Sequence, residues 1–333
     1  MYELLALCLS LAGLLVIHTL AMLLVTMFWR VCSGFAEFWR PSVRAQFLFL
    51  LRITPGLAAI LCVGMLFLPA YLSHEPRQTT EIVTAKLGVL AALSLYAIGF
   101  ALWRGFATCL VTRRLVKDWL KQAEPVVIED VTIPTYRFQH PFPVIAIVGA
   151  VRPRLFIAGQ IFHSLNREEI AAAVAHERGH LLAGDNLKRG LLRCCRDIQT
   201  IMPLGRALDR AWTGAAELAA DEHAARDGAS VALNLASALV KVARLAPRGG
   251  RPAALAGASL ITEDLSSISA RVLRLTQLAA RSDDLRQVDF RLPKLAIGAG
   301  LSSLLIASIV MVYSTNFLAV IHSAMECVVS VFQ

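Results

Sequence analysis

Long apolar runs set the architecture of this chain. A helix needs roughly 20 predominantly apolar residues to cross the hydrocarbon core of a bilayer. The chain of 333 residues is 56% hydrophobic and only 17% charged, whereas a soluble domain carries about 25% charged residues. The sequence therefore predicts a polytopic, mainly α-helical membrane protein with four transmembrane helices. The four apolar runs cover residues 4–29, 53–72, 87–103 and 295–321.

Basic residues between these runs predict how the spans are oriented, because Lys and Arg collect in cytoplasmic loops. They follow the first and third runs and precede the fourth, whereas the loop between the second and third has little beyond Arg77. We therefore expect a multi-pass protein of the inner (plasma) membrane, with both termini extracytoplasmic and residues 104–294 cytoplasmic. This topology explains the net charge of +9, so direct nucleic acid binding is not expected. The loop residues are Arg30, Arg40, Arg44 and Arg52, then Arg104, Arg113, Arg114, Lys117 and Lys121, and finally Arg286, Arg291 and Lys294.

Residues 104–294 are predicted to form a soluble α+β domain between a membrane part at 1–103 and a last span with a short tail at 295–333. The domain begins with an amphipathic basic stretch that reaches about residue 123. Short strands rich in Val, Ile and aromatic residues are expected between residues 126 and 159. Asn166 and Glu169 have capping-box spacing at the start of a helix that should stop near Gly184. Further helices are expected over 185–202, 206–226, 229–246 and 264–281.

A charged motif lies in the first of these helices. His176, Glu177 and His180 form the pattern HExxH. Residues four apart on a helix share a face, so both imidazoles point toward one place, as the first two ligands of a tetrahedral Zn²⁺ require. Glu177 lies one step around the helix, where its carboxylate can take a proton from a zinc-bound water. Small apolar residues around the motif predict that this helix is buried.

A catalytic zinc site needs a third protein ligand and an open position for water. The longer pattern HExxHxxGxxH is excluded, because Ala183 and Asn186 stand where it has Gly and His. In "AAELAADEHAARDG", Glu217 and Asp221 are four apart and share a face. We take Glu217 as the third ligand, with Glu222 or an exposed acidic face as the alternatives. Asp221 would accept the outer N–H of a ligand histidine.

Three further features have both a functional and a structural interpretation. His223 and Arg271 could hold the oxyanion opposite the metal, or be a helix-surface histidine and a structural ion pair. The strand at 152–158 could bind substrate as an added edge strand or be an ordinary sheet strand. The basic helix at 185–202 could lie on an anionic membrane interface or pack its leucines on the zinc helix. Its basic residues are Lys188, Arg189, Arg193 and Arg196.

The segments "RPRLFIAGQIFHSLNREEIAAAVAHERGHLLAGDNLKRGLL" and "ELAADEHA" resemble the antirepressor-type membrane zinc metallopeptidases, the BlaR/MecR group. The resemblance covers most of the chain, including three spans before the zinc helix and one after it. It implies a gluzincin-like cytoplasmic domain in which His176, His180 and Glu217 hold zinc and Glu177 is the base.

The pair Asp185–Asn186 and the sequence "ARVLRL" around Arg271 also look like the pattern of that family. Its sensor members carry an extracellular penicillin-binding domain after the last span. This chain has only a short tail there, so β-lactam sensing is not expected, and no feature identifies a repressor substrate. CAAX-prenyl and HtpX-type membrane proteases share HExxH and the ExxxD pattern, but HtpX-type chains usually place two spans before the zinc helix.

The sequence thus predicts a membrane-embedded zinc endopeptidase that cleaves a cytoplasmic or membrane-proximal protein in regulated signalling proteolysis. The expected cofactor is Zn²⁺. The expected partners are a protein or peptide substrate (a transcriptional repressor or a membrane protein), the lipid bilayer and a second copy of the chain. The alternatives are a quality-control or processing protease of the HtpX or CAAX kind and a non-catalytic signalling scaffold. The intact HExxH with Glu217 argues against the scaffold, which has no need of Glu177.

Overall fold

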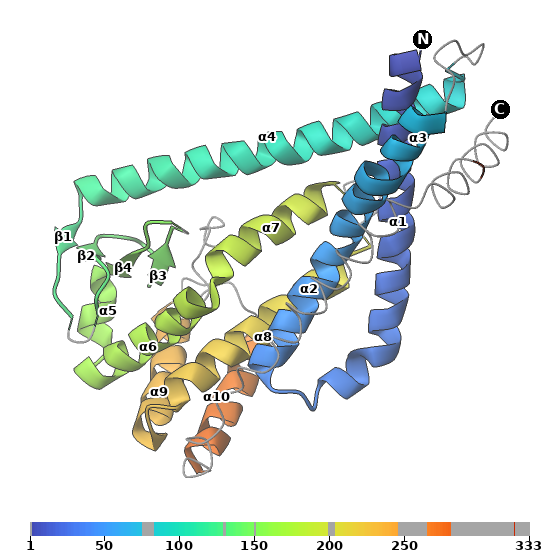
Figure 1. Cartoon of the computed structure of the whole chain (residues 1–333). Coiled ribbons are helices and arrows are strands. Elements are labelled where there is room, and N and C mark those ends of the chain that lie inside the picture. Colours follow the sequence, from blue (N-terminus) through green and yellow to red (C-terminus); the bar gives the residue numbers. More distant parts are fainter. Residues whose placement is uncertain are drawn as a thin grey trace.

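The computed structural model describes residues 2–74, 83–128, 131–149, 151–198, 204–245, 265–280 and 323. Within them, three helical stretches are long and apolar enough to cross a membrane (Figure 1). The protein is therefore mainly helical, with three candidate membrane spans. The fourth predicted span, residues 295–321, lies outside the described residues. The three stretches are α1 (Tyr2–Ala36), then Pro41–His74, made of α2 (Pro41–Leu61), the π-helical η1 (Cys62–Phe67) and α3 (Leu68–His74), and α4 (Ala85–Lys121).

These three helices lie where the apolar runs predict them, but they are longer than the runs. The second begins at Pro41 rather than near residue 53, because proline fits the first turn of a helix, where its missing N–H costs no hydrogen bond. The third begins after Thr84, whose hydroxyl accepts from the backbone N–H of Leu87, and it continues to Lys121. The predicted boundary at 103–104 therefore falls inside α4. The helix continues because α7 (Asp185–Ile198) packs along its basic second half.

A small sheet forms one end of the part that carries the HExxH motif. Its strands are short, as predicted, and their order is β1-β2-β4-β3, with β2 parallel to β4 and the other pairs antiparallel. Segment 152–158 contains β4, which pairs on both sides, so the edge-strand role considered for it is wrong. The edge nearest the motif is β3. The strands are β1 (Glu124–Pro125), β2 (Thr135–Phe138), β3 (Ile145–Val148) and β4 (Arg154–Ala158).

Helices α5 to α10 follow the sheet, and the five longer ones confirm the predicted helices. The capping box is present: the Asn166 side chain accepts from the backbone N–H of Glu169, and the Glu169 carboxylate accepts from that of Asn166. The helix that follows ends at Gly184, whose φ of 70° is a left-handed conformation that glycine adopts without strain. Besides α7, these helices are α5 (Gly159–Ser164), α6 (Arg167–Ala183), α8 (Arg206–Ala225), α9 (Ala229–Leu245) and α10 (Leu265–Ala280).

The core of this part lies between the sheet and helices α6, α9 and α10. Phe156 and Ile157 of β4 are fully buried, and so are Leu235 of α9 and Leu275 of α10. One face of α6 packs on α9 and another on α8. The helix with the HExxH motif is therefore enclosed on several sides, as its small apolar residues predict.

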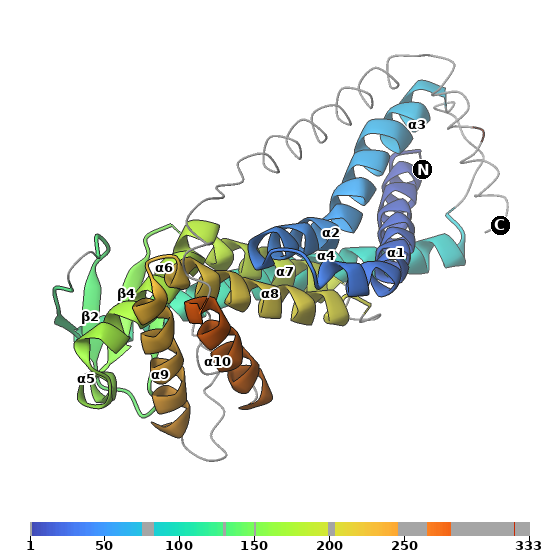
Figure 2. The same cartoon turned by 90° about the horizontal axis from the view of Figure 1, so that it is seen from below.

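Helices α7 and α8 join this part to the candidate membrane spans. α8 packs along α2, and α7 packs along α4 (Figures 1 and 2). Trp29 of α1, Leu192 of α7 and Trp212 of α8 meet in one buried apolar cluster. Arg52 of α2 is 1% exposed and donates from Nε to Oδ1 of Asp209 on α8 at 3.0 Å. The two parts thus share a core.

Candidate metal centre

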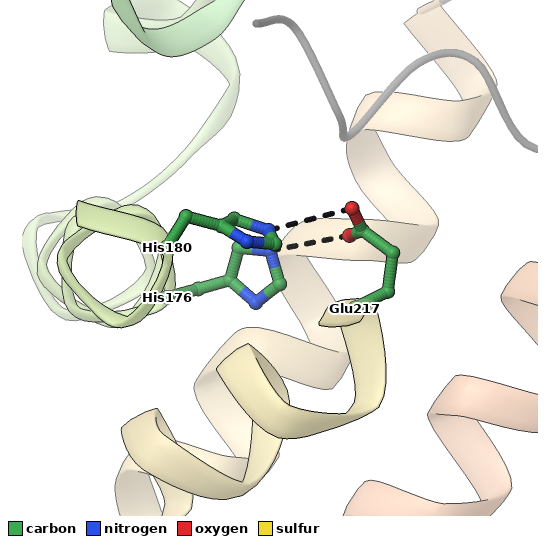
Figure 3. A group of neighbouring side chains, drawn as sticks. All are labelled: His176, His180 and Glu217. Carbon is green, nitrogen blue, oxygen red and sulfur yellow. Dashed lines mark ion pairs between the residues drawn. The ribbon is translucent and has the colours of Figure 1, made fainter. Parts of the chain in front are cut away.

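Three buried side chains bring potential ligand atoms together where α6 packs on α8. His176 and His180 project from α6 toward Glu217 of α8 (Figure 3), and one ligand atom of each lies within 4.8 Å of the others. Nε2 of His176 is 3.5 Å from Oε2 of Glu217, and Nε2 of His180 is 3.4 Å from Oε1. The structure therefore brings together the three residues that the sequence analysis names as ligands.

Each histidine nitrogen lies near the ligand spacing of a tetrahedral metal ion from one oxygen of Glu217, and the two distances end on different oxygens of that carboxylate. With metal–ligand bonds of about 2.0–2.1 Å, two ligands at a tetrahedral angle lie about 3.3–3.4 Å apart. Nε2 of His176 and Oε2 of Glu217 are both buried and lie 3.5 Å apart without a hydrogen bond of good geometry, and buried polar atoms in this position call for an explanation such as a bound ion. Two imidazoles and one carboxylate are also a ligand set of catalytic zinc. The residues present fit Zn²⁺.

The outer nitrogen of each imidazole faces a carboxylate. Nδ1 of His176 lies 2.9 Å from Oδ1 of Asp221, and Nδ1 of His180 lies 2.7 Å from Oδ2 of Asp185. A carboxylate in this position fixes the tautomer and leaves Nε2 for a metal. Asp221 stands where its spacing from Glu217 predicts. Asp185 received no individual role from the sequence; its signal was its position directly after Gly184, where α7 begins beside the last turn of α6.

Glu177 lies between the ligands and the edge of the sheet. It is 1% exposed, its Oε2 accepts from the backbone N–H of Ile147 in β3 at 3.3 Å, and its Oε1 has no hydrogen-bond partner among the described residues. Burial raises the pKa of this carboxyl in spite of the neighbouring histidines. The carbonyl of Ile147 accepts from the amide of Asn186 at 2.9 Å. Both outward hydrogen-bonding groups of Ile147 are therefore engaged by residues at the site.

Carboxylates outnumber basic side chains at this centre. Four acidic residues meet three basic ones, so the formal charge with neutral imidazoles is negative by one. Burial alone would lower the pKa of His180, but Glu217 and Asp185 outweigh it and raise that pKa to about 10. Protons on the imidazoles thus offset the excess negative charge, and a divalent cation could do so in their place. The acidic residues are Glu177, Asp185, Glu217 and Asp221, and the basic ones are Lys188, Arg189 and Arg271.

The two buried acidic groups of α8 are ionised. Burial opposes this, but the imidazolium of His180, the close contacts with both histidines and the charge of Arg271 hold the pKa of Glu217 well below its usual range. For Asp221, Arg271 and His176 outweigh the same cost of burial and lower the pKa. Glu217 is therefore in the protonation state that a metal ligand needs.

Two arginines contact the third ligand. Arg271 binds both carboxylate oxygens of Asp221, at 2.8 and 2.7 Å, and its Nη1 lies 3.3 Å from Oε2 of Glu217. This contact is the ion pair considered as the alternative to an oxyanion-holding role. Arg189 of α7 donates to Oε1 of Glu217 at 3.0 Å. In the sequence Arg189 belongs to a basic helix face, and nothing local distinguishes it from Lys188 or Arg193.

His223 is not one of the three residues whose ligand atoms come together, but it lies beside α6, where a Cβ atom on Gly179 would be 3.2 Å from the Cβ atom of the histidine. It lines a cavity of about 1030 Å³ together with Ile147 and Arg178. Ile147 is the residue whose backbone N–H is bonded to Glu177, so this cavity reaches the edge of the site. Burial and the charge of Arg226 lower the pKa of His223. The oxyanion role considered for His223 stays a prediction.

Helix α7 packs mainly along α4 and α2 rather than on α6, so the interpretation that its leucines pack on the helix with the HExxH motif is wrong. Its position at an anionic membrane interface stays a prediction. Leu192 is buried, but Leu187 and Leu191 are 60% and 44% exposed, and Arg189 turns inward to Glu217. The physical reason is that the buried carboxylates draw Arg189 out of the basic face.

A scan against models of protein families and a search of curated proteins found no match to this chain.

Proposed function

We propose that this chain is a membrane-embedded, zinc-dependent endopeptidase that hydrolyses peptide bonds of a cytoplasmic or membrane-proximal protein. The observation that carries the proposal is the convergence of His176, His180 and Glu217, with one potential ligand atom of each within 4.8 Å of the others and Glu177 beside them. A bound zinc ion would polarise the scissile carbonyl and lower the pKa of a water molecule at its open position.

The residues around the ligands have separate tasks in this proposal. Asp221 and Asp185 hold the imidazoles in the orientation and tautomer that present Nε2. Glu177 accepts the proton of the attacking water and passes it to the leaving amine. Its raised pKa suits this work, because a proton carrier is most effective when its pKa lies near the working pH. Its free Oε1 is the atom that would take the proton.

The packing of the centre supports a substrate at the membrane. The helices that carry Glu217 and Arg189 lie directly on α2 and α4, two of the three candidate spans. Arg40, just before α2, and Arg44, near its start, support a cytoplasmic position for this end of the spans. Regulated signalling proteolysis, as the BlaR/MecR resemblance implies, and quality control of membrane proteins would both use a site at this depth.

A non-catalytic scaffold could keep a structural metal, but it would gain nothing from Glu177. A buried carboxyl with an unpartnered oxygen is costly, and here it lies beside the proposed ligands rather than among them. An ordinary structural site closes its fourth position with a protein ligand. The described residues supply three ligands, which leaves room for water.

The test is Glu177→Gln, with Glu168→Gln as the matched control, because Glu168 is an exposed carboxylate on the same helix. The glutamine keeps the size of the side chain and its acceptor for Ile147 but cannot take a proton. We expect about one zinc ion per chain in all three proteins. Cleavage should fall by about 10²–10⁴ in Glu177→Gln only.

Cells that express each form would be compared by labelling the new N-termini of cleaved proteins. Fragments that appear with wild type and Glu168→Gln but not with Glu177→Gln identify substrates. Equal fragments in all three forms, at equal zinc content, would exclude Glu177 as the base. Loss of zinc from Glu177→Gln would make it a structural residue and favour the scaffold.

A further inference from the structure

A second cleft lies next to the metal centre. It has a volume of about 640 Å³ and is enclosed by the middle of α4, the end of β3 with the turn after it, and α7. Its walls include the apolar side chains of Val116, Val148 and Val151. This volume is within the usual range of ligand pockets and is large enough to hold several residues of an extended peptide.

The charge of this cleft is entirely of one sign. Its described lining contains five arginines and no acidic residue, and Arg113, Arg152 and Arg154 have no carboxylate partner among the described residues. Burial and the charges of Arg196 and Arg189 lower the pKa of Arg193, which shows how closely the positive charges crowd. Like charges gathered without counterions attract an anion. The five residues are Arg113, Arg152, Arg154, Arg189 and Arg193.

Two residues connect the cleft to the metal centre. Arg189 lines the cleft and donates to the ligand Glu217. Asn186 lines it as well and donates to the carbonyl groups of Ile147 and Gly149 at 2.9 and 3.3 Å. The N–H of Ile147 in turn is bonded to Glu177. A peptide bound in the cleft would therefore be separated from the proposed ligand Glu217 by Arg189 and from the proposed base Glu177 by Asn186 and Ile147.

We propose that this arginine-lined cleft binds an acidic segment of the protein substrate, next to the bond that is cleaved. That the bound segment belongs to a protease substrate rests on the proposed function. The test below does not, because it measures peptide binding alone. A segment that alternates carboxylate and apolar side chains matches both the arginines and the valines. Binding of acidic side chains would also supply ion-pair partners to Arg113, Arg152 and Arg154, which have none among the described residues.

The test uses the full chain with Glu177→Gln in nanodiscs of phosphatidylcholine, so that no peptide is cut. The probe is a fluorescent twelve-residue peptide in which glutamate alternates with valine and threonine, and the reference peptide has glutamine for glutamate. We expect the acidic peptide to bind about tenfold or more tightly at low ionic strength, with the preference falling as salt is added. Arg113→Glu and Arg152→Glu should each reduce the preference by about fivefold.

Arg114→Glu is the matched control, because it makes the same charge change at the next residue of α4 but does not line the cleft. Its preference should equal that of the background protein. Equal affinity for the two peptides, or an equal loss in Arg114→Glu and Arg113→Glu, would overturn the inference. The inference would also be overturned if the protein shows no peptide preference but retains phosphatidylglycerol only while Arg113 and Arg152 are intact. The occupant of the cleft would then be a lipid headgroup.

Failure of the inference is distinguishable from failure of the proposed function. If the peptide preference is missing while wild type still cleaves proteins in a Glu177-dependent way, only the role of the cleft is wrong. If the preference is present while no Glu177-dependent fragment is found, the cleft binds acidic peptides and the protease proposal falls.

Discussion

A substitution at Gly179 should change the spacing of the proposed metal ligands without replacing any of them. This glycine lies in α6 between His176 and His180, and it faces α8. A Cβ atom at this position would lie 3.1 Å from Cα of Ala220, 3.2 Å from Cβ of His223 and 3.3 Å from Cβ of Ala220. Carbon atoms pack comfortably at about 3.5–4.0 Å, so alanine here would push α6 and α8 apart by about 0.4 Å.

This displacement is larger than a metal site tolerates. Ligand distances in a working site stay within about 0.2 Å of their preferred values. Gly179→Ala should therefore weaken zinc binding on the order of tenfold or more. The effect on folding should be smaller, because overpacking costs about 1–3 kcal/mol and the better helix propensity of alanine offsets up to about 1 kcal/mol of it.

Gly214→Ala is the control, since an added Cβ there has no atom within 4 Å. It lies on α8 one turn before Glu217, and it should keep the zinc affinity and stabilise the helix by up to about 1 kcal/mol. Zinc affinity would be measured by competition with a chelating dye, and stability by thermal unfolding of the metal-free proteins. The packing argument is refuted if Gly179→Ala binds zinc as tightly as Gly214→Ala.

Three shorter predictions follow from other parts of the structure. Glu217→Ala should lose most of the bound zinc in metal analysis, whereas Glu222→Ala, which removes the neighbouring acidic residue that the structure leaves outside the cluster, should keep it; the reverse would move the third ligand to Glu222. Burial would raise the pKa of Glu169, but hydrogen bonds from Lys241 and Ser237 hold this pKa below its usual value. The ionised Glu169 therefore stabilises the fold above about pH 4.3, and this stabilisation is lost as the pH falls through the lower pKa of the folded state. The unfolding free energy should fall less steeply with acid in Glu169→Gln than in wild type, and equal slopes would contradict this. A reporter fused after residue 125 should behave as cytoplasmic, and an extracytoplasmic signal there would overturn the orientation derived from the loop charges.

Features of the fold that depend on neighbours in the sequence could be predicted from it. The capping box at Asn166, the stop at Gly184 and the helix that carries HExxH all depend on residues within one or two turns. The pairing of Glu217 with Asp221 is also a local property, because four residues make about one turn. Only the packing of α6 on α8 was needed to bring these two local patterns together.

Features that depend on distant segments could not be predicted in the same way. The order of the strands, which makes β3 the edge and β4 an inner strand, arises from pairing between segments whose own sequences look alike. The inward turn of Arg189 depends on where Glu217 lies, 28 residues later. The continuation of α4 past residue 103 depends on α7, which packs along it.

The contact between Arg52 and Asp209 explains why the site and the spans form one unit. Arg52 lies so close to the start of α8 that a Cβ atom at position 205 would be 2.5 Å from its Nε, which only Gly205 avoids. Burial raises the pKa of Asp209 in spite of Arg52, so the pair does not offset the full cost of removing its charges from water. A buried pair of this kind contributes more to fixing the position of a helix than to stability. From Asp209 to Glu217 is about two turns, or about 12 Å of one uninterrupted helix. A shift of α2 at Arg52 would therefore be transmitted along α8 to Glu217, and we expect the geometry of the candidate metal centre to depend on the arrangement of the candidate membrane spans.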